Sequence, residues 1–298
     1  MANRRSTPPG TSRTGATETQ MAANVVRDLA PILEAKFGLR GRTAVITGGA
    51  GTLCSVMAQG YAQAGANVIL WDIRQDALDA AVRGVADACG NPAQVAACRV
   101  DLMNEASIAA GVEESSKTFG GIDILINGAG GTRGKSPLIE AKLEDLEFVV
   151  KLNLFAGCLL PTKHMAKYWI ENGIRGTVIN IASMASFNPL SGVWAYSAAK
   201  AAVMNQTMAH AKELAPYGIR VNAIAPGFLV AEQNRSLLLN EDGTMTQRGK
   251  DVIAHTPMGR FGGPDDLVAA VIFLAGEGAR FVSGITVPID GAYLCQNI

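Results

Sequence analysis

The chain has 298 residues, 48% of them hydrophobic and 17% charged, a balance that suits a large core with a sheet covered on both faces. Lys and Arg together number 26, as do Asp and Glu, so a zero net charge gives no reason to expect nucleic acid or an anionic membrane as a partner. No apolar run reaches the roughly 18 residues of a membrane helix, and none follows the basic start as in a secretory signal.

The first 40 residues are expected to form an N-terminal extension. Residues 1–20 are rich in Ser, Thr, Gly, Pro and Arg without apolar periodicity, which predicts a disordered start. Their excess of arginine over acid leaves a transit peptide as an alternative. Apolar residues at helical spacing from Met21 to Phe37 predict a helix there, with a potential kink at Pro31.

From residue 41 to the end, short β-branched runs alternate with longer Ala-rich segments of helical length. The strands are predicted to begin at Thr43, Asn67, Val95, Ile122, Thr177, Ile219 and Ile285. Such alternation is typical of βαβ units, which place parallel strands side by side. The sequence therefore predicts one α/β domain over 41–298, a doubly wound parallel sheet of about seven strands with helices on both faces.

The first predicted strand leads into a glycine-rich turn and then a helix of small residues, TAVITGGAGTLCSVMAQ. Glycine lets the backbone approach a pyrophosphate, and a helix N-terminus offers free N–H groups and the positive end of its dipole. A glycine-rich turn alone is weak evidence, but strand, turn, helix and next strand follow here in the order of a Rossmann dinucleotide site. The residues expected at the cofactor in this turn are Gly48, Gly51, Thr52 and Leu53.

Asp72 closes the second predicted strand, 25 residues after Thr47, where an acid can accept hydrogen bonds from the adenosine ribose. A carboxylate there repels the 2′-phosphate of NADP, so NAD is the expected cofactor. Arg74 argues for NADP, because a cation nearby could accept that phosphate. We favour Asp72 over Arg74 as the determinant of cofactor choice because it stands at the strand end itself. The competing interpretation is that Asp72 is an acid in a turn that faces solvent and binds no cofactor.

Tyr196 and Lys200 form a Y-x-x-x-K pair, and the spacing of four places both side chains on one helix face. An ammonium beside a phenol stabilises the phenolate and lowers its pKa, which makes the tyrosine a usable acid and base near neutral pH. The pair follows a strand ending in serines, with Ser183 13 residues before Tyr196. A hydroxyl there can bond the substrate oxygen, although Ser186 competes for this role and Ser183 could instead cap a turn.

Together these motifs resemble the short-chain dehydrogenase/reductase family over nearly all of Gly41 to Gly291. Further positions that match the family are Asp101 beside Leu102 after the third strand, Asn127, Gly128, Ala129 and Gly130 after the fourth, Asn153 in a later helix, and Pro226 and Gly227 after the sixth. The resemblance implies a catalytic tetrad of Asn153, Ser183, Tyr196 and Lys200. Asp101, Leu102, Asn127, Gly128, Ala129, Tyr196, Lys200, Pro226 and Gly227 complete the implied cofactor site.

The same resemblance implies an NAD(H)-dependent enzyme that interconverts a secondary alcohol and a ketone. Tyr196 would exchange a proton with the substrate oxygen while hydride moves between the substrate carbon and the nicotinamide. Ser183 would hold that oxygen and Lys200 would bind the nicotinamide ribose and lower the pKa of Tyr196. Asn153 would keep a water in place for a proton relay.

Two places depart from the family pattern. Thr52 and Cys54 stand where the second and third glycines of the turn usually fall, and Ala231 replaces a common threonine. The third glycine allows close packing of helix on strand, and Cys54 is bulkier. These turn residues also suggest a cofactor-binding regulator without turnover, an alternative against which the intact tetrad argues.

Residues 228–262 form a connection expected to lie over the substrate, at the carboxyl ends of the strands. The polar run from Glu232 to Arg235, with the segments INGAGG and LLPT, resembles the D-mannonate oxidoreductase (fructuronate reductase) branch of the family. That resemblance implies a sugar acid such as D-mannonate or D-fructuronate. A dehydrogenase for a neutral sugar, polyol or other secondary alcohol is the alternative.

A sugar acid needs one cation for its carboxylate and several hydrogen-bond partners for its hydroxyls. Arg235 is the first candidate for that cation, with Arg133 and Lys135 as alternates, and Gln233 and Asn234 are candidates for the hydroxyls. A solvated face of this substrate lid is the competing interpretation for each of them. A neutral substrate would not need Arg235.

The remaining expectations concern partners and location. The five cysteines are widely spaced without a C-x-x-C pair, which predicts reduced thiols in a cytoplasmic protein and neither a disulfide framework nor a metal site. The expected partner is a small-molecule substrate. The family resemblance implies a homotetramer.

Overall fold

The computed structural model describes residues 29–231 and 235–296. All seven predicted strands are present in one parallel sheet with the order β3-β2-β1-β4-β5-β6-β7. Their bounds are Thr43–Thr47 for β1, Asn67–Asp72 for β2, Val95–Arg99 for β3, Ile124–Asn127 for β4, Thr177–Ile181 for β5, Arg220–Pro226 for β6 and Thr286–Ile289 for β7. The predicted doubly wound α/β fold is therefore confirmed, with the order of strands reversing between β1 and β4.

The central strands are continuous apolar runs because both faces of the sheet are covered. Every residue of β1 and β4 is buried, and β1 pairs with β2 on one side and β4 on the other. At the edge, β7 is only partly buried and contains Pro288. Proline is tolerated at an edge position because it lacks the N–H that a central ladder needs.

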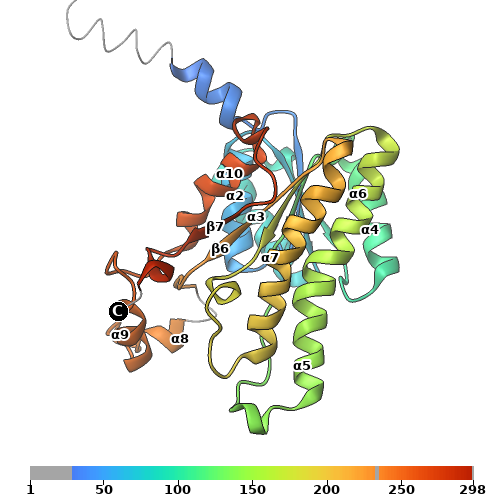
Figure 1. Cartoon of the computed structure of the whole chain (residues 1–298). Helices are drawn as coiled ribbons and strands as arrows, with labels where there is room; N and C mark the ends of the chain where they lie inside the picture. Colours follow the sequence, from blue (N-terminus) through green and yellow to red (C-terminus); the bar gives the residue numbers. More distant parts are fainter. Residues whose placement is uncertain (1–28, 232–234, 297–298) are drawn as a thin grey trace, which may run out of the picture.

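Helices cover the two faces of the sheet as separate layers (Figure 1). One core lies between the sheet and α2 (Thr52–Gln63), α3 (Gln75–Cys89) and α10 (Val268–Ala275). The other lies between the sheet and α4 (Glu105–Thr118), α6 (Leu160–Asn172) and α7 (Trp194–Leu214). On this second face α5 (Leu143–Val150) runs into α6 through a π-helical segment, η3 (Lys151–Leu159).

The N-terminal extension is helical over 29–37, in agreement with the predicted helix that ends at Phe37. The ring of Phe37 lies 6.2 Å from the ring of Phe273, which joins this helix to α10. The predicted disorder of residues 1–20, and the predicted start of the helix at Met21, lie outside the described residues.

The connection after β6 carries two short helices, α8 (Arg235–Leu238) and α9 (Gln247–Ala254). Figure 1 shows both at the end of the sheet where β6 and β7 finish. An isolated bridge between Leu229 and Gly262 closes the base of this lid. Two of the predicted substrate residues, Gln233 and Asn234, lie outside the described residues.

Candidate active site

The predicted site residues gather at one edge of the sheet, because parallel strands bring their carboxyl ends together. Thr47, Asp72, Asn127 and Pro226 are the last residues of β1, β2, β4 and β6, and Ser183 lies just after β5. The carboxyl edge therefore brings together residues that are scattered over most of the sequence.

The turn after β1 has the shape of an anion cradle. Gly48 has a φ of +64°, and a Cβ there would lie 2.9 Å from Cα of Ala129, so a larger residue does not fit. Helix α2 begins at Thr52, directly after Gly51, and no side chain caps its N-terminus. Its first turn, which includes Thr52 and Leu53, contains no acidic residue. Its first N–H groups are thus available to a phosphate oxygen.

A single hydroxyl ties this turn to the end of β4. The Thr47 Oγ1 accepts hydrogen bonds from the backbone N–H groups of Gly128, at 3.0 Å, and Ala129, at 3.3 Å. It donates to the carbonyl oxygen of Ile126 at 3.3 Å. These bonds fix the loop after β4 against the turn after β1, so the positions of Gly128 and Ala129 are set by Thr47.

The structure shows how Cys54 fits where the family usually has glycine. Cys54 is buried in α2, and a Cβ on Gly128 would lie 2.3 Å from its Sγ. The thiol therefore occupies the space that a side chain at position 128 would need. Burial raises the pKa of the Cys54 thiol to about 12, so it packs as a neutral group.

Asp72 and Arg74, which predict different cofactors, form one ion pair. The buried Asp72 Oδ1 accepts hydrogen bonds from the backbone N–H of Arg74, at 3.1 Å, and from its Nε, at 3.2 Å. The side chain of Arg74 is 63% exposed, whereas that of Asp72 is 8% exposed. A ligand at this strand end would therefore meet a fixed carboxylate with a guanidinium already bonded to it.

Asp101 and Asn127 differ in what their side chains contact. Asp101 Oδ1 accepts the N–H of Met103 at 2.9 Å and follows β3, with Leu102 buried beside it. The Nδ2 of Asn127 lies 2.8 Å from both Thr162 Oγ1 and Asn180 Oδ1. The side chain of Asn127 thus joins β4 to β5 and α6 within the core, so a contribution to the cofactor site would come through its backbone or through the position of the strand end.

The segment after β6 also requires glycine. The backbone N–H of Gly227 donates to the Ile289 carbonyl at 2.9 Å, and a Cβ there would lie 2.6 Å from Cα of Asp290. Pro226 is buried as the last residue of β6. After β6 the chain passes very close to the end of β7, and only glycine at position 227 leaves room for this approach.

Tyr196 and Lys200 lie one turn apart in α7, as predicted, and the Lys200 Nζ is 5.8 Å from the centroid of the Tyr196 ring. The hydroxyl of Ser183 lies beside the phenol of Tyr196, close enough to affect its pKa. Burial raises the pKa of Tyr196, and the hydroxyl of Ser183 acts in the opposite direction. The lowering expected from Lys200 does not appear in the protein alone, where burial has the larger effect.

The two serines differ in the hydrogen bonds that their hydroxyls form. Ser186 Oγ donates to the carbonyl oxygen of Lys200 at 2.7 Å and accepts the N–H of Ser183 at 3.2 Å. Ser183 Oγ accepts the N–H of Ala185 at 3.1 Å and also meets the phenol of Tyr196. Ser183 is therefore both the turn cap and the hydroxyl beside Tyr196, while Ser186 supports the backbone.

The ammonium of Lys200 is buried and donates to the carbonyl oxygen of Ile181 at 2.6 Å. Burial lowers the pKa of Lys200 to about 8. A Cβ at Gly130 would lie 3.4 Å from the Lys200 Nζ and 2.6 Å from the Asn153 Oδ1. The loop after β4 can therefore pass beside these two side chains because position 130 is glycine.

Asn153 lies within the π-helical segment η3 and is fully buried. Its Nδ2 donates to the carbonyl oxygens of Gly131, at 2.7 Å, and Val149, at 2.8 Å, and its Oδ1 accepts the N–H of Gly131 at 3.1 Å. A π-helical turn departs from the regular hydrogen-bond ladder and is frequent at functional sites. Asn153 thus connects the helix to the loop after β4 and joins the same cluster as Lys200.

The three candidate substrate cations have different surroundings. The Arg133 Nε donates to Asp145 Oδ1 at 2.5 Å, and its guanidinium lies 4.3 Å from the centroid of the Phe148 ring. Lys135 runs beside Gly192, just before α7, where a Cβ would lie 3.2 Å from the lysine Cγ. Arg235 begins α8 with an exposed side chain. Within the described residues, the charged groups of Lys135 and Arg235 have no ion-pair partner.

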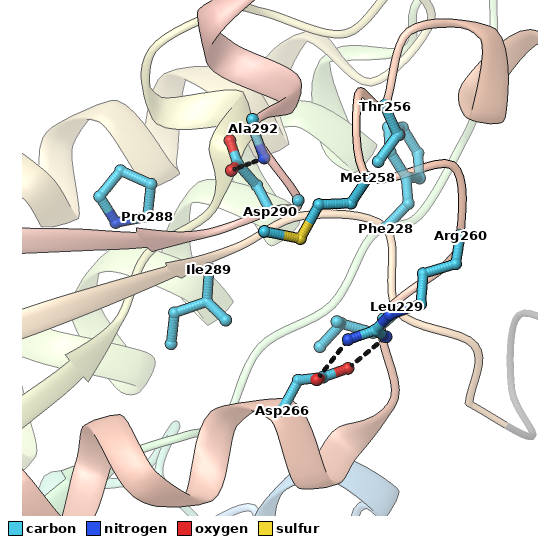
Figure 2. A pocket seen from close by; sticks show the side chains of 12 residues that line it. Phe228, Leu229, Thr256, Met258, Arg260, Asp266, Pro288, Ile289, Asp290 and Ala292 are labelled. Carbon is cyan, nitrogen blue, oxygen red and sulfur yellow. Dashed lines mark hydrogen bonds and ion pairs between the residues drawn. The ribbon is translucent and has the colours of Figure 1, made fainter.

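A cavity of about 370 Å³ lies beside the lid, between Phe228 and Leu229 after β6 and Met258 (Figure 2). The charged groups around it are already bonded to protein. Arg260 donates to both carboxylate oxygens of Asp266, at 2.8 and 2.9 Å, as the dashed lines in Figure 2 mark. None of the predicted tetrad lines this cavity, so it neighbours the candidate site and does not contain its chemistry.

Several groups of this site could not have been assigned from residue types. The carbonyl of Ile181, which accepts from Lys200, and the backbone of Gly131, which bonds Asn153, leave no signal in a sequence. Asp145, which holds Arg133, was also missed. Its signal would be an acid in the first turn of a predicted helix near a basic loop, which is weak evidence.

Over residues 29–231 and 235–296, no three His, Cys, Asp or Glu side chains cluster as metal ligands would. In the same ranges, no helix is both long enough and apolar enough to cross a membrane.

Comparison with known proteins identifies a family profile and several relatives that match most of this chain. The profile described as enoyl-(acyl carrier protein) reductase, of the short-chain alcohol dehydrogenase type, matches residues 49–293. An uncharacterised oxidoreductase of Bacillus subtilis strain 168, UxuB, is 40% identical over 273 residues, which are 87% of this chain and 97% of that protein.

Two solved structures match over almost their whole length. One, from Haemophilus influenzae, was provisionally assigned as a D-mannonate oxidoreductase and contains NAD; it is 35% identical, with a TM-score of 0.81, over 89% of this chain and 99% of that one. The other, from Beutenbergia cavernae, was provisionally assigned as a gluconate 5-dehydrogenase and contains NADP at low occupancy; it is 34% identical, with a TM-score of 0.78, over 88% and 100%. The chain is therefore a member of the short-chain dehydrogenase/reductase family, an NAD(P)-dependent oxidoreductase that acts on an alcohol or a ketone.

Proposed function

We propose that this enzyme uses NAD(H) to interconvert a secondary alcohol and a ketone on a sugar acid, with D-mannonate and D-fructuronate as the first pair to test. The observation that carries the proposal is the juxtaposition of Ser183, whose hydroxyl lowers the pKa of Tyr196, with Tyr196 itself and with Lys200 one turn away on the same helix. A hydroxyl pair at the carboxyl edge, next to an anion cradle, is what proton exchange with a substrate oxygen requires.

The residues of this edge fit a nicotinamide dinucleotide. The uncapped start of α2 and the close approach at Gly48 suit a pyrophosphate, and the end of β2 presents Asp72 for a ribose. When bound, the nicotinamide supplies or accepts the hydride, which no side chain of the protein can do. The residues that would hold the dinucleotide are Gly48, Gly51, Thr52, Leu53, Asp72, Asp101, Leu102, Asn127, Gly128, Ala129, Tyr196, Lys200, Pro226 and Gly227.

The tetrad then orients the substrate and moves a proton. In the direction of oxidation, the Tyr196 phenolate oxygen takes the proton of the substrate hydroxyl, and in reduction the Tyr196 phenol returns one. Ser183, which lies beside Tyr196, holds the substrate oxygen next to the phenol. A charged Lys200 favours the phenolate, against the effect of burial, and Asn153 fixes the loop that contacts Lys200.

The preference for NAD rests on Asp72. Its carboxylate is buried and fixed by two hydrogen bonds from Arg74, so a 2′-phosphate would meet a negative group that cannot move away. The Nε of Arg74 is already engaged by that carboxylate, which weakens Arg74 as a receptor for the phosphate. The related structure with NAD supports this choice, and the one with NADP shows that the other cofactor occurs among relatives.

The sugar-acid assignment rests on the relatives and on cations that have no ion-pair partner within residues 29–231 and 235–296. Arg133 is held by Asp145, which leaves Arg235 and Lys135 as the stronger candidates for a carboxylate. Arg235 is the first choice because Gln233 and Asn234 precede it with amide groups suited to hydroxyls. Two related structures provisionally assigned to mannonate and gluconate support a polyhydroxy acid.

A substrate panel tests this proposal. Purified enzyme would be assayed for reduced nicotinamide with NAD or NADP and D-mannonate, D-gluconate and the matched neutral polyols, and in reverse with D-fructuronate. We expect turnover with NAD and a sugar acid, and much less with the neutral polyols. Faster turnover of a polyol would overturn the substrate class, and no turnover of any alcohol would favour a cofactor-binding regulator.

We also propose the homotetramer that the family resemblance implies. Exposed apolar side chains on the long helix of α5, η3 and α6, such as Phe155 and Ile170, at 45% and 39%, support burial of this helix in an assembly. Light scattering of the purified protein would test it, and a monomeric mass would contradict it. The cytoplasmic location stays a prediction.

A further inference from the structure

A second cavity, of about 460 Å³, lies at the opposite end of the molecule from the candidate active site. Four arginines line it: Arg42, Arg175, Arg220 and Arg280. We call it the arginine cavity. We propose that it binds a phosphate group, as inorganic phosphate or as a phosphate monoester, at a site separate from that of the dehydrogenase reaction.

The topology of the sheet brings these arginines together. Arg42 immediately precedes β1, Arg220 is the first residue of β6, and Arg175 stands two residues before β5. Arg280 lies between α10 and β7. The amino ends of parallel strands share one edge, so cations distant in sequence converge there, away from the carboxyl edge that holds Tyr196.

Two of the four arginines already have structural roles. Arg220 donates to Thr177 Oγ1 at 3.0 Å and to the Ala275 carbonyl, at the end of α10, at 3.2 Å. The Arg42 Nε lies 3.3 Å from Asp123 Oδ1, yet this buried N–H is not aligned to form a hydrogen bond. Burial and then the charge of Arg42 lower the pKa of Arg220, so the two guanidiniums repel each other.

The other two arginines point to a ligand. Arg175 and Arg280 are exposed, and neither side chain has a hydrogen bond or an ion pair with any residue that the structure describes. Glu277 is the one carboxylate among the ten lining residues; it is not within ion-pair distance of any described arginine, although its charge acts to raise the pKa of Arg220. In a chain of zero net charge, this cavity therefore gathers four arginines against one lining carboxylate, and two of the four have no ion-pair partner among the described residues.

The geometry favours phosphate over carboxylate. The four arginines belong to four separate segments of the chain, so the cavity offers several guanidinium groups rather than a single fork. A tetrahedral phosphate can accept hydrogen bonds from several forks at once, whereas the two coplanar oxygens of a carboxylate suit one fork. The volume exceeds the need of a bare phosphate, and Pro216 and Tyr217 supply a wall for the uncharged part of a monoester.

Calorimetric titration of the enzyme saturated with NADH tests this site, because saturation removes the competing anion cradle at α2. Inorganic phosphate and glycerol 3-phosphate would be compared at constant ionic strength against chloride. We expect one site per chain, with R175Q and R280Q each weakening binding about tenfold and the double variant removing it. The matched control R83Q removes an exposed arginine of α3 outside the cavity and should leave binding unchanged.

The two anions distinguish the source of the phosphate group. Tighter binding of the monoester would identify an organic phosphate as the ligand, and equal binding would mean that the phosphate group alone is recognised. Unchanged turnover in phosphate-free buffer would show that R175Q and R280Q remain folded. Equal affinity of wild type and the double variant, or no heat beyond that of chloride, would overturn the proposal.

Discussion

The two parts of the candidate active site differ in how their polar groups are held. Around the tetrad, Lys200 donates to a carbonyl, Asn153 bonds two backbone segments, and Ser183 meets Tyr196. In the lid, Arg235 is exposed, and α8 and α9 are short helices held mainly by local bonds such as that from Thr246 to Leu237. The first region is fixed by the sheet, and the second is a surface connection.

This difference suggests a division of labour. Chemistry common to alcohols and ketones needs groups held at fixed distances, which buried hydrogen bonds provide. Recognition of a particular substrate needs side chains that vary without disturbing the fold, and exposed lid positions allow that. Changes near the tetrad should therefore affect every substrate or the fold itself, whereas changes in the lid should affect substrates selectively.

The largest expected effect is the loss of kcat in the variant Tyr196→Phe. The phenol is the one proton carrier in the proposed mechanism, and general acid–base catalysis contributes roughly 10²–10⁴-fold. We expect kcat to fall by about that factor for every substrate, while the affinity for NAD, measured by fluorescence titration, stays nearly the same. A variant that kept more than about a tenth of wild-type kcat would show that Tyr196 is not the acid and base.

The next effect should be selective for the substrate. Loss of a guanidinium that binds a carboxylate costs about 10- to 100-fold in kcat/KM, because such bonds are directional and charge-assisted. Arg235→Ala should therefore impair a sugar acid while sparing its neutral polyol analogue. Lys135→Ala is the parallel variant in the loop after β4.

The outcomes of these two variants separate the explanations. An acid-selective loss in Lys135→Ala, with none in Arg235→Ala, would move carboxylate binding to the loop after β4. Equal losses on acid and polyol in Arg235→Ala would mean that this arginine stabilises the lid.

The same contrast explains what could be predicted from the sequence. All seven strands were located within two residues, because buried parallel strands are apolar runs bounded by breaks. Ser183 could not be separated from Ser186 by spacing, since the distinction depends on the bond from Ser186 to the Lys200 carbonyl. The pairing of Asp72 with Arg74 is likewise a matter of side-chain geometry.

The arginine cavity was not predicted, for a related reason. Its cations are spread from Arg42 to Arg280, and they follow no spacing that a motif could capture. Only the strand order places them on one edge. The lid poses a different difficulty, because an exposed polar run has the same composition whether it binds a substrate or water.

A third prediction concerns packing beside the cofactor turn. Gly128→Ala would place a Cβ 2.3 Å from the Cys54 Sγ and 2.8 Å from the Thr47 carbonyl oxygen. Overpacking of this kind costs about 1–3 kcal/mol, which denaturant unfolding would measure. The control is Gly263→Ala, where the added Cβ meets nothing within 4 Å.

A double-mutant cycle identifies the cause. Adding Cys54→Gly should recover part of the stability lost in Gly128→Ala, because it removes the sulfur that the new Cβ would strike. Independent effects of the two changes would mean that the contact between Cys54 and Gly128 does not account for the loss.

A smaller effect is expected on cofactor choice. Asp72→Ser removes the negative charge at the end of β2 and frees the Nε of Arg74. The ratio of kcat/KM for NAD to that for NADP should fall by about tenfold, the size of one charge-assisted hydrogen bond. A wild-type enzyme that already prefers NADP would reverse this interpretation and make Arg74 the determinant.

The smallest expected effect, taken per pH unit, is a gradual change of stability with pH that originates at Lys200. Its pKa is about 8 in the folded protein, below the value near 10.4 of an unfolded lysine. Below pH 8 the residue is charged in both states, and the folded state bears the cost of burying that charge. Between pH 8 and about 10.4 the unfolded chain binds more protons, so stability rises with pH, by about 1 kcal/mol per unit.

Comparison with Lys200→Met, which cannot titrate, isolates this contribution. The free energy of unfolding of the cofactor-free wild type, minus that of the variant, should increase as the pH rises from 8 to 10. The other titrating groups are common to both proteins and cancel in this difference. Lys250→Met removes an exposed lysine of the lid and should give a curve parallel to the wild type. Parallel curves for Lys200→Met as well would mean that the ammonium is solvated in the folded protein, and the contrast between a fixed site and a variable lid would then not extend to Lys200.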